Sequence, residues 1–211
     1  MPNPKEDSII FIESNTYAIK SNFGAISDYS NELNGIREEL KKIDRVAEIE
    51  RDFFIHEGQW SYAANYHHAQ YIERMKRLNE RREELGEQDQ DHIRKALIRI
   101  GATEEALATI AGSILQFGKK ILSYRYGPKG NLPNTRNIAT IDLTEIIWEG
   151  RNHSMHWEEN NPRAGVTNLL TTLQNETGIT FPSNENNAFK ILELIEWDSP
   201  DDMINEMKSI M

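Results

Sequence analysis

Residues 107–124 read LATIAGSILQFGKKILSY and carry the clearest apolar pattern of the chain. Apolar side chains return there every three or four positions, at Leu107, Ile110, Ile114, Phe117, Ile121 and Tyr124. This is the helical period, whereas a half-buried strand would alternate with a period of two. The stretch therefore predicts a central core helix. We expect it to begin around Asp91 and to end before Gly127-Pro128, because proline cannot continue a helix.

The remaining apolar residues also follow the helical period, and no segment alternates long enough to predict a sheet. Asp142-Leu143-Thr144-Glu145 is a capping signal for a helix that continues through Trp157. Further apolar repeats predict a helix closed by Gly178, another around Ile191 and a short terminal helix that starts at Pro200. The predicted fold class is all-α.

Residues 31–88 are much more polar than the core helix, with only narrow apolar stripes. They predict two long helices that turn near Gly58 and form an antiparallel hairpin. The expected organisation is a polar N-terminal helical hairpin in residues 1–90, a helical core in residues 91–198 and a C-terminal helix in residues 199–211.

Composition excludes several classes of function. The 211 residues include 34 acids and 24 bases, a net charge of −10, which argues against a protein that coats DNA without sequence preference. The chain has no cysteine, so disulfides, thiolate metal sites and cysteine nucleophiles are excluded. The longest apolar stretch without charge, residues 106–118, is shorter than the roughly 20 residues of a membrane span. We expect a soluble cytoplasmic protein with no membrane partner and no signal peptide.

One segment reverses the sign of the overall charge. Residues 106–141 contain no acid and five bases, Lys119, Lys120, Arg125, Lys129 and Arg136. Aromatic residues lie among these bases, a combination that is typical of grooves for single-stranded nucleic acid. The alternative is that the bases complement a helix C-terminus and that the tyrosines are half-buried in the core.

The six histidines do not have the spacing of common metal sites. No Glu is followed by His three positions later, as a di-iron bundle requires, and His56-Glu57 lacks the second histidine of a zincin motif. We therefore expect no metal and no other cofactor.

Residues 149–159, EGRNHSMHWEE, contain Arg151 and His156 with four residues between them, and Asn152 directly follows the arginine. This segment resembles the Arg-x4-His signature of the HEPN superfamily, in the Arg-Asn variant common among its ribonucleases. The same spacing occurs in residues 51–56, where an acid follows the arginine and two phenylalanines suit a core. We interpret that second match as coincidence.

The resemblance implies a HEPN-like helical bundle and metal-independent cleavage of single-stranded RNA by its own 2′-hydroxyl. His156 would be the general base or acid, Arg151 would bind the scissile phosphate, and Asn152 would orient the histidine or the phosphate. Their supporting neighbours would be His153, Ser154 and Trp157. Some toxin members carry a tyrosine two residues after the histidine; Glu158 stands there in this chain, which excludes modification at that position.

On an ideal helix Asn152 and His156 share a face, while Arg151 lies about 140° from His156. One chain then offers an incomplete site. The resemblance implies an isologous homodimer in which two motifs face each other. It also implies a toxin or antiviral effector, with an antitoxin or other regulatory protein as a further partner.

The competing hypothesis is a non-catalytic helical module that binds a protein partner through the polar hairpin. An enzyme should expose Arg151 and His156 in a shared cleft, whereas a scaffold should bury or separate them.

Overall fold

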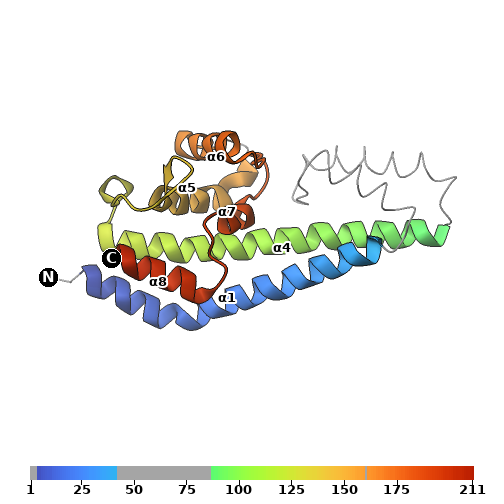
Figure 1. Ribbon diagram of the computed structural model, residues 1–211, viewed down its shortest axis with the longest axis horizontal. Coiled ribbons are helices and arrows are strands. Elements are labelled where there is room, and N and C mark those ends of the chain that lie inside the picture. The colour runs from blue at the N-terminus through green and yellow to red at the C-terminus, as the bar shows by residue number, and fades with distance from the viewer. Residues whose placement is uncertain (1–3, 42–86, 160) are drawn as a thin grey trace. The chain divides into compact units, whose positions relative to one another are not determined.

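The computed structural model describes residues 4–41, 87–159 and 161–211, and this part of the chain is mostly helical (Figure 1). The α-helices within it are α1 (Pro4–Lys41), α4 (Glu87–Tyr126), α5 (Leu143–His156), α6 (Ala164–Thr177), α7 (Ala188–Leu194) and α8 (Pro200–Ile210). Short 3-10 turns cover Lys129–Asn131 and Trp157–Glu159, and the two-residue strands β1 (Asn137–Ile138) and β2 (Ile141–Asp142) pair antiparallel. The all-α prediction is confirmed.

The chain divides into two compact units that differ from the expected organisation. One unit contains the residues up to Ser27 together with Ala108–Met211, and the other contains Asp28–Leu107. Both α1 and α4 contribute to each unit, and α4 runs without a break through the expected boundary at residue 90. Most of the expected hairpin and the second Arg-x4-His match, residues 51–56, lie outside the described residues.

The beginning of α1 belongs to the core of the first unit, although the sequence indicated no separate role for it. Ile12, Ile19 and Phe23 are buried in the same apolar cluster as residues of α4, α5 and α8. In Figure 1, α8 lies between α1 and α4, and α5 and α7 lie on the other side of α4. These three apolar side chains lie seven and four positions apart, a helical spacing that does not by itself show which partner they pack against.

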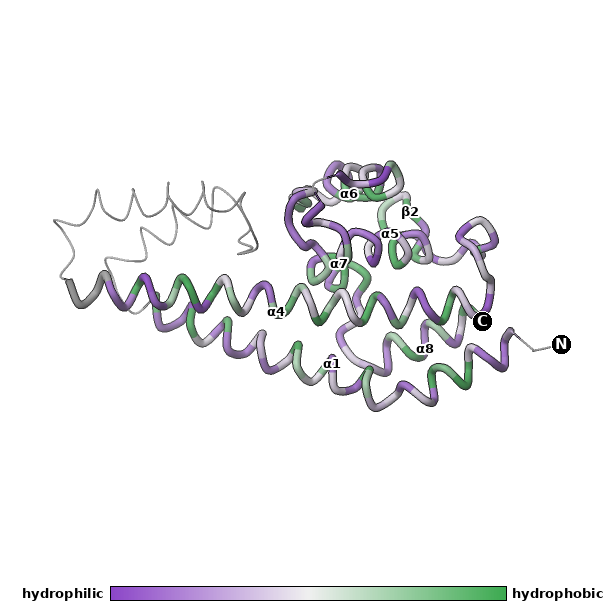
Figure 2. The backbone as a smooth tube through the Cα atoms, turned by 180° about the vertical axis from the view of Figure 1, so that it is seen from behind, coloured by the Kyte–Doolittle hydropathy of each residue, from purple (hydrophilic) through white to green (hydrophobic). Residues whose placement is uncertain are grey.

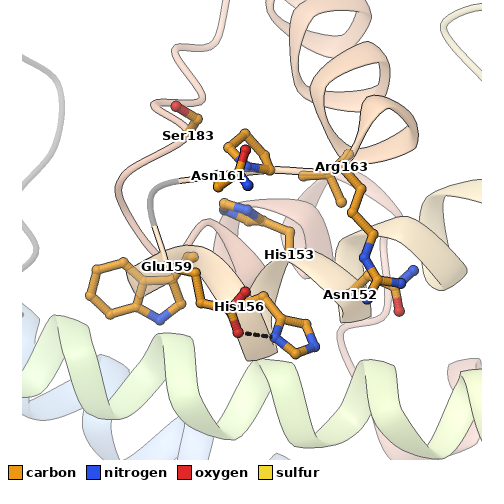
Figure 3. A pocket seen from close by; sticks show the side chains of 10 residues that line it. Asn152, His153, His156, Glu159, Asn161, Arg163 and Ser183 are labelled. Atoms are coloured by element: carbon orange, nitrogen blue, oxygen red, sulfur yellow. Dashed lines mark hydrogen bonds and ion pairs between the residues drawn. The ribbon is translucent and has the colours of Figure 1, made fainter.

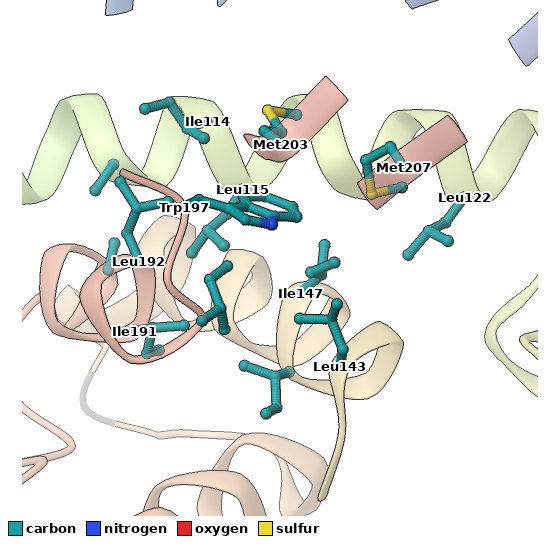
Figure 4. Packing of buried hydrophobic residues seen from close by; sticks show 14 of the residues in the cluster. Ile114, Leu115, Leu122, Leu143, Ile147, Ile191, Leu192, Trp197, Met203 and Met207 are labelled. Carbon is teal, nitrogen blue, oxygen red and sulfur yellow. The ribbon is translucent and has the colours of Figure 1, made fainter. Parts of the chain in front are cut away.

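Glycines allow the helices of the first unit to pack closely. A Cβ atom on Gly118 of α4 would lie 3.0 Å from Cγ2 of Ile147 and 3.1 Å from the Trp197 ring. Figure 4 shows Trp197 packed among the buried side chains contributed by α4, α5 and α8. Because protein interiors are close-packed, this arrangement holds α5 at a defined position against α4.

The predicted caps are present. The Asp142 side chain accepts a hydrogen bond from the Thr144 N–H at the start of α5. Gly178 ends α6 in the left-handed conformation, with φ at 72°. The helix predicted to start at Pro200 is also present, and Ser199, which was not predicted as its cap, accepts a hydrogen bond from the Asp202 N–H. Local sequence therefore sets the bounds of the helices that carry the motif and its surroundings.

The second unit pairs the end of α1 with the beginning of α4. Its buried apolar residues include Leu33, Ile36, Ile93 and Ile100. Figure 2 shows that apolar residues recur between polar ones along both helices. Within the described ranges no helix has the length and apolar character needed to cross a membrane.

Candidate functional site

Helix α5 presents the residues of the Arg-x4-His motif to three environments. Gly150 and His153 face the core, Arg151 and Asn152 are half-buried, and His156 at the end of the helix is exposed. A Cβ atom on Gly150 would lie 3.2 Å from Ile191, so a small residue is needed where α5 approaches α7. The motif thus lies on one helix, and its last two residues, Met155 and His156, are open to solvent.

The imidazole of His156 is oriented by a carboxylate. Its Nδ1 lies 2.6 Å from Oε1 of Glu159, which the 3-10 turn after α5 brings back over the helix end (Figure 3). An ionised carboxylate only accepts hydrogen bonds, so Nδ1 carries the proton. Nε2 then has a free lone pair, and no side chain or backbone group in the described ranges hydrogen-bonds to it. This arrangement suits a general base.

His156 lines a partly open pocket of about 30 Å³ between the end of α5 and the start of α6. Asn152, Trp157 and Glu159 also line this pocket, together with Arg163 from the segment before α6 (Figure 3). The predicted proximity of Asn152 and His156 on one face of the helix is therefore present.

Arg151 does not line the pocket that contains His156. Its Nε donates a hydrogen bond to Oε1 of Gln116 on α4, and burial lowers its pKa from the usual value. No carboxylate of the described residues pairs with it; Glu149, the nearest acid in sequence, pairs with Lys129 instead. The motif's arginine and histidine therefore point to different surroundings, as the helical angle between them predicts.

Asn152 connects the pocket to α4. Its Oδ1 accepts a hydrogen bond from Nζ of Lys119 at 2.6 Å, and its Nδ2 donates to Oε2 of Glu149 at 3.0 Å. The same ammonium lies 4.5 Å from the centre of the Trp148 ring. Asn152 makes no hydrogen bond to His156, so in this structure it positions Lys119 rather than the imidazole.

Two other bases of the acid-free segment, Lys129 and Arg136, are engaged by acids from elsewhere in the chain. Lys129 pairs with Glu145 and Glu149 at 2.9 and 2.7 Å, and Arg136 pairs with Glu206. Arg125, in the last turn of α4, donates to the carbonyl oxygen of the C-terminal residue. Lys120 is exposed. The segment lacks acids in sequence, yet folding supplies counter-charges to two of its five bases.

The three neighbours predicted to support the site have different roles. Ser154 donates a hydrogen bond to the carbonyl oxygen of Arg151 and packs against Gly112 of α4. Trp157 is buried and forms part of the pocket wall. His153 is buried, and its Nε2 lies 2.7 Å from the carbonyl oxygen of Glu185. Burial lowers the pKa of His153 to about 4, so it is neutral near pH 7.

We expect the free energy of unfolding to decrease as the pH is lowered, because of His153. Its pKa is about 4 in the folded chain and 6.5 as the ordinary value, so the unfolded chain takes up the proton first as the pH falls. Stability is thus complete above pH 6.5 and declines toward pH 4, by about 3 kcal/mol in total. Urea unfolding of wild type and His153→Gln at several pH values measures this difference. Parallel curves for wild type and His153→Gln would contradict the assignment.

Two residues of the site, Glu159 and Arg163, were not predicted from sequence. Glu159 is three positions after His156, a spacing at which side chains on a helical turn meet, so this signal was present. Arg163 follows Asn161-Pro162, which indicated only a helix end. Its approach to His156 depends on how α6 packs on α5.

The described side chains contain no cluster of three His, Asp or Glu residues that would hold a metal ion. Comparisons with protein-family models, curated proteins and solved structures find no significant match to this chain.

Proposed function

We propose that the chain is a metal-independent endoribonuclease that cleaves single-stranded RNA. The observation that carries the proposal is the His156 imidazole, held at Nδ1 by Glu159 with Nε2 directed to an open pocket that also contains an arginine. A base and a cation in one pocket are what attack by a 2′-hydroxyl on its neighbouring phosphate requires.

In the proposed reaction, Nε2 of His156 removes the proton of the 2′-hydroxyl. The 2′-oxygen then bonds to phosphorus as the bond to the 5′-oxygen breaks, which leaves a 2′,3′-cyclic phosphate and a 5′-hydroxyl once the leaving oxygen is protonated. A second copy of the chain in an isologous dimer would supply a second histidine for that protonation. The HEPN-like family, the cytoplasmic location and the role as a toxin or antiviral effector under an antitoxin or regulator remain parts of this proposal that rest on the resemblance.

The test is incubation of the full chain with end-labelled single-stranded RNA in EDTA, followed by analysis of the product ends. We expect cutting that leaves cyclic phosphate and 5′-hydroxyl ends. An RNA of the same sequence with 2′-deoxyribose at each cut position is the matched control and should stay intact, because it lacks the nucleophile. Cleavage of the deoxy-substituted positions, or a strict need for a divalent metal, would contradict the mechanism.

The second candidate is a non-catalytic module that binds a protein partner. The separation of Arg151 from the His156 pocket favours it, because a scaffold has no need to bring the two residues together. The same assay distinguishes the two functions, since a scaffold leaves every RNA intact in EDTA and in magnesium.

A further inference from the structure

We infer that Arg163, rather than the motif's Arg151, binds the scissile phosphate beside His156; this inference rests on the proposed function. Arg163 and His156 line one pocket, whereas Arg151 lies outside it, hydrogen-bonded to Gln116. A phosphate held by Arg163 would lie within the same open space as the Nε2 that acts on the adjacent 2′-hydroxyl.

The sequence around Arg163 explains why it lies over α5. Pro162 ends the preceding segment, and the extended backbone of Arg163 leads directly into α6. Gly165, two residues later, allows close approach: a Cβ atom there would lie only 2.7 Å from Oε1 of Glu149 on α5. Figure 3 shows the Arg163 side chain running from the start of α6 toward Asn152. The contact between Gly165 and Glu149 thus places the guanidinium at the pocket.

The charges around the pocket leave Arg163 available for an anion. Its side chain is exposed, and no ion pair or hydrogen bond joins it to an acid within the described ranges. The two acids nearby are already engaged, because Glu159 holds His156 and Glu149 holds Lys129. A guanidinium with both edges free can bind a phosphate through two parallel hydrogen bonds.

Neighbouring cations strengthen the attraction for a phosphate. Burial and then the charge of Arg151 lower the pKa of Lys119, and Arg163 adds to this effect while Glu149 opposes it. These cations are therefore close enough to repel one another. A bound phosphate would relieve the repulsion, which makes this region of an acidic chain a local site for anions.

The inference changes the role expected of Arg151. One chain then supplies both the base and the phosphate-binding cation, and Arg151 becomes a positioning residue that ties α5 to Gln116 of α4. The dimer is not needed to bring an arginine to His156.

The experiment compares RNA cleavage by Arg163→Ala, Arg163→Lys and Arg151→Ala with that by Lys208→Ala, which removes an equal charge from an exposed position of α8. We expect a loss of about 10²–10³-fold for Arg163→Ala, as for removal of one donor to a developing charge. Arg163→Lys should lose less, Arg151→Ala less than tenfold, and Lys208→Ala nothing. Wild-type cleavage by Arg163→Ala, with its fold verified by circular dichroism, would overturn the inference and leave the proposed function standing.

A binding measurement keeps the two proposals separable. Inorganic phosphate is titrated into isotope-labelled protein while the side-chain signals of His156 and Asn152 are followed by NMR. We expect saturable shifts in wild type and Lys208→Ala and none in Arg163→Ala. If wild type cuts no RNA, the proposed function fails, and the titration alone decides the phosphate site: equal shifts in wild type and Arg163→Ala would overturn it.

Discussion

Alanine in place of His156 is expected to lower the rate of RNA cleavage by about 10²–10⁴-fold, the usual contribution of a positioned general base. The side chain is 49% exposed, and among the described residues its imidazole hydrogen-bonds only to Glu159, so its removal should leave the fold intact. Initial rates on a single labelled RNA, measured with thermal unfolding of the same samples, test the expectation.

His92→Ala is the matched control, because His92 is another exposed histidine and lies in the other compact unit. It should retain the wild-type rate. Glu159→Ala should give a smaller loss than His156→Ala, since the imidazole remains but its orientation is no longer held. Unchanged cleavage by His156→Ala would place the base elsewhere in the chain.

Methionine in place of Lys129 is expected to lower the free energy of unfolding by about 3 kcal/mol. The Glu149 side chain is only 8% exposed, and Lys129 is its cationic partner at 2.7 Å. Loss of one partner of a buried ion pair leaves an uncompensated charge, at a cost of about 3–5 kcal/mol. We expect the lower end because the Lys129 side chain is 36% exposed, so water reaches one side of the pair.

Urea unfolding at pH 7 measures this effect, with Lys120→Met as the control that removes an exposed lysine of the same acid-free segment. The control should change stability by less than about 0.5 kcal/mol. The double variant Lys129→Met with Glu149→Gln should recover part of the loss, because the buried charge is removed with its partner. Equal stability of Lys129→Met and wild type would contradict the prediction, because water would then stabilise the Glu149 carboxylate as well as Lys129 does.

The helices were predictable because their signals lie within a few residues of each other. Asp142 caps α5 through Thr144, and Gly178 ends α6 with a backbone conformation that favours glycine. The division into two compact units was not predictable from such local signals, because it depends on contacts between residues far apart in the sequence. Ile12 of α1 packs with residues about a hundred positions later, and nothing in its own neighbourhood indicates that partner.

The bases of the acid-free segment also have partners that are distant in sequence and could not be predicted from it. Counted along the chain, Lys129 and Arg136 belong to a positive patch. In the folded chain their charges are matched by Glu149 and by Glu206, the latter 70 residues from Arg136. The charges within a segment give only its net charge. The electrostatic potential at the folded surface also depends on which distant acids packing brings close to the segment.

The amino-acid sequence by itself determined that the protein is all-α, where α4 and α5 end, and that Asn152 and His156 share a face. Each of these depends on the helical repeat and on hydrogen bonds across at most four residues. Only the tertiary structure decided which cation lines the same pocket as His156. Arg151 turns toward Gln116 because it lies on another side of α5, while close packing of Gly165 on Glu149 brings Arg163 to the pocket.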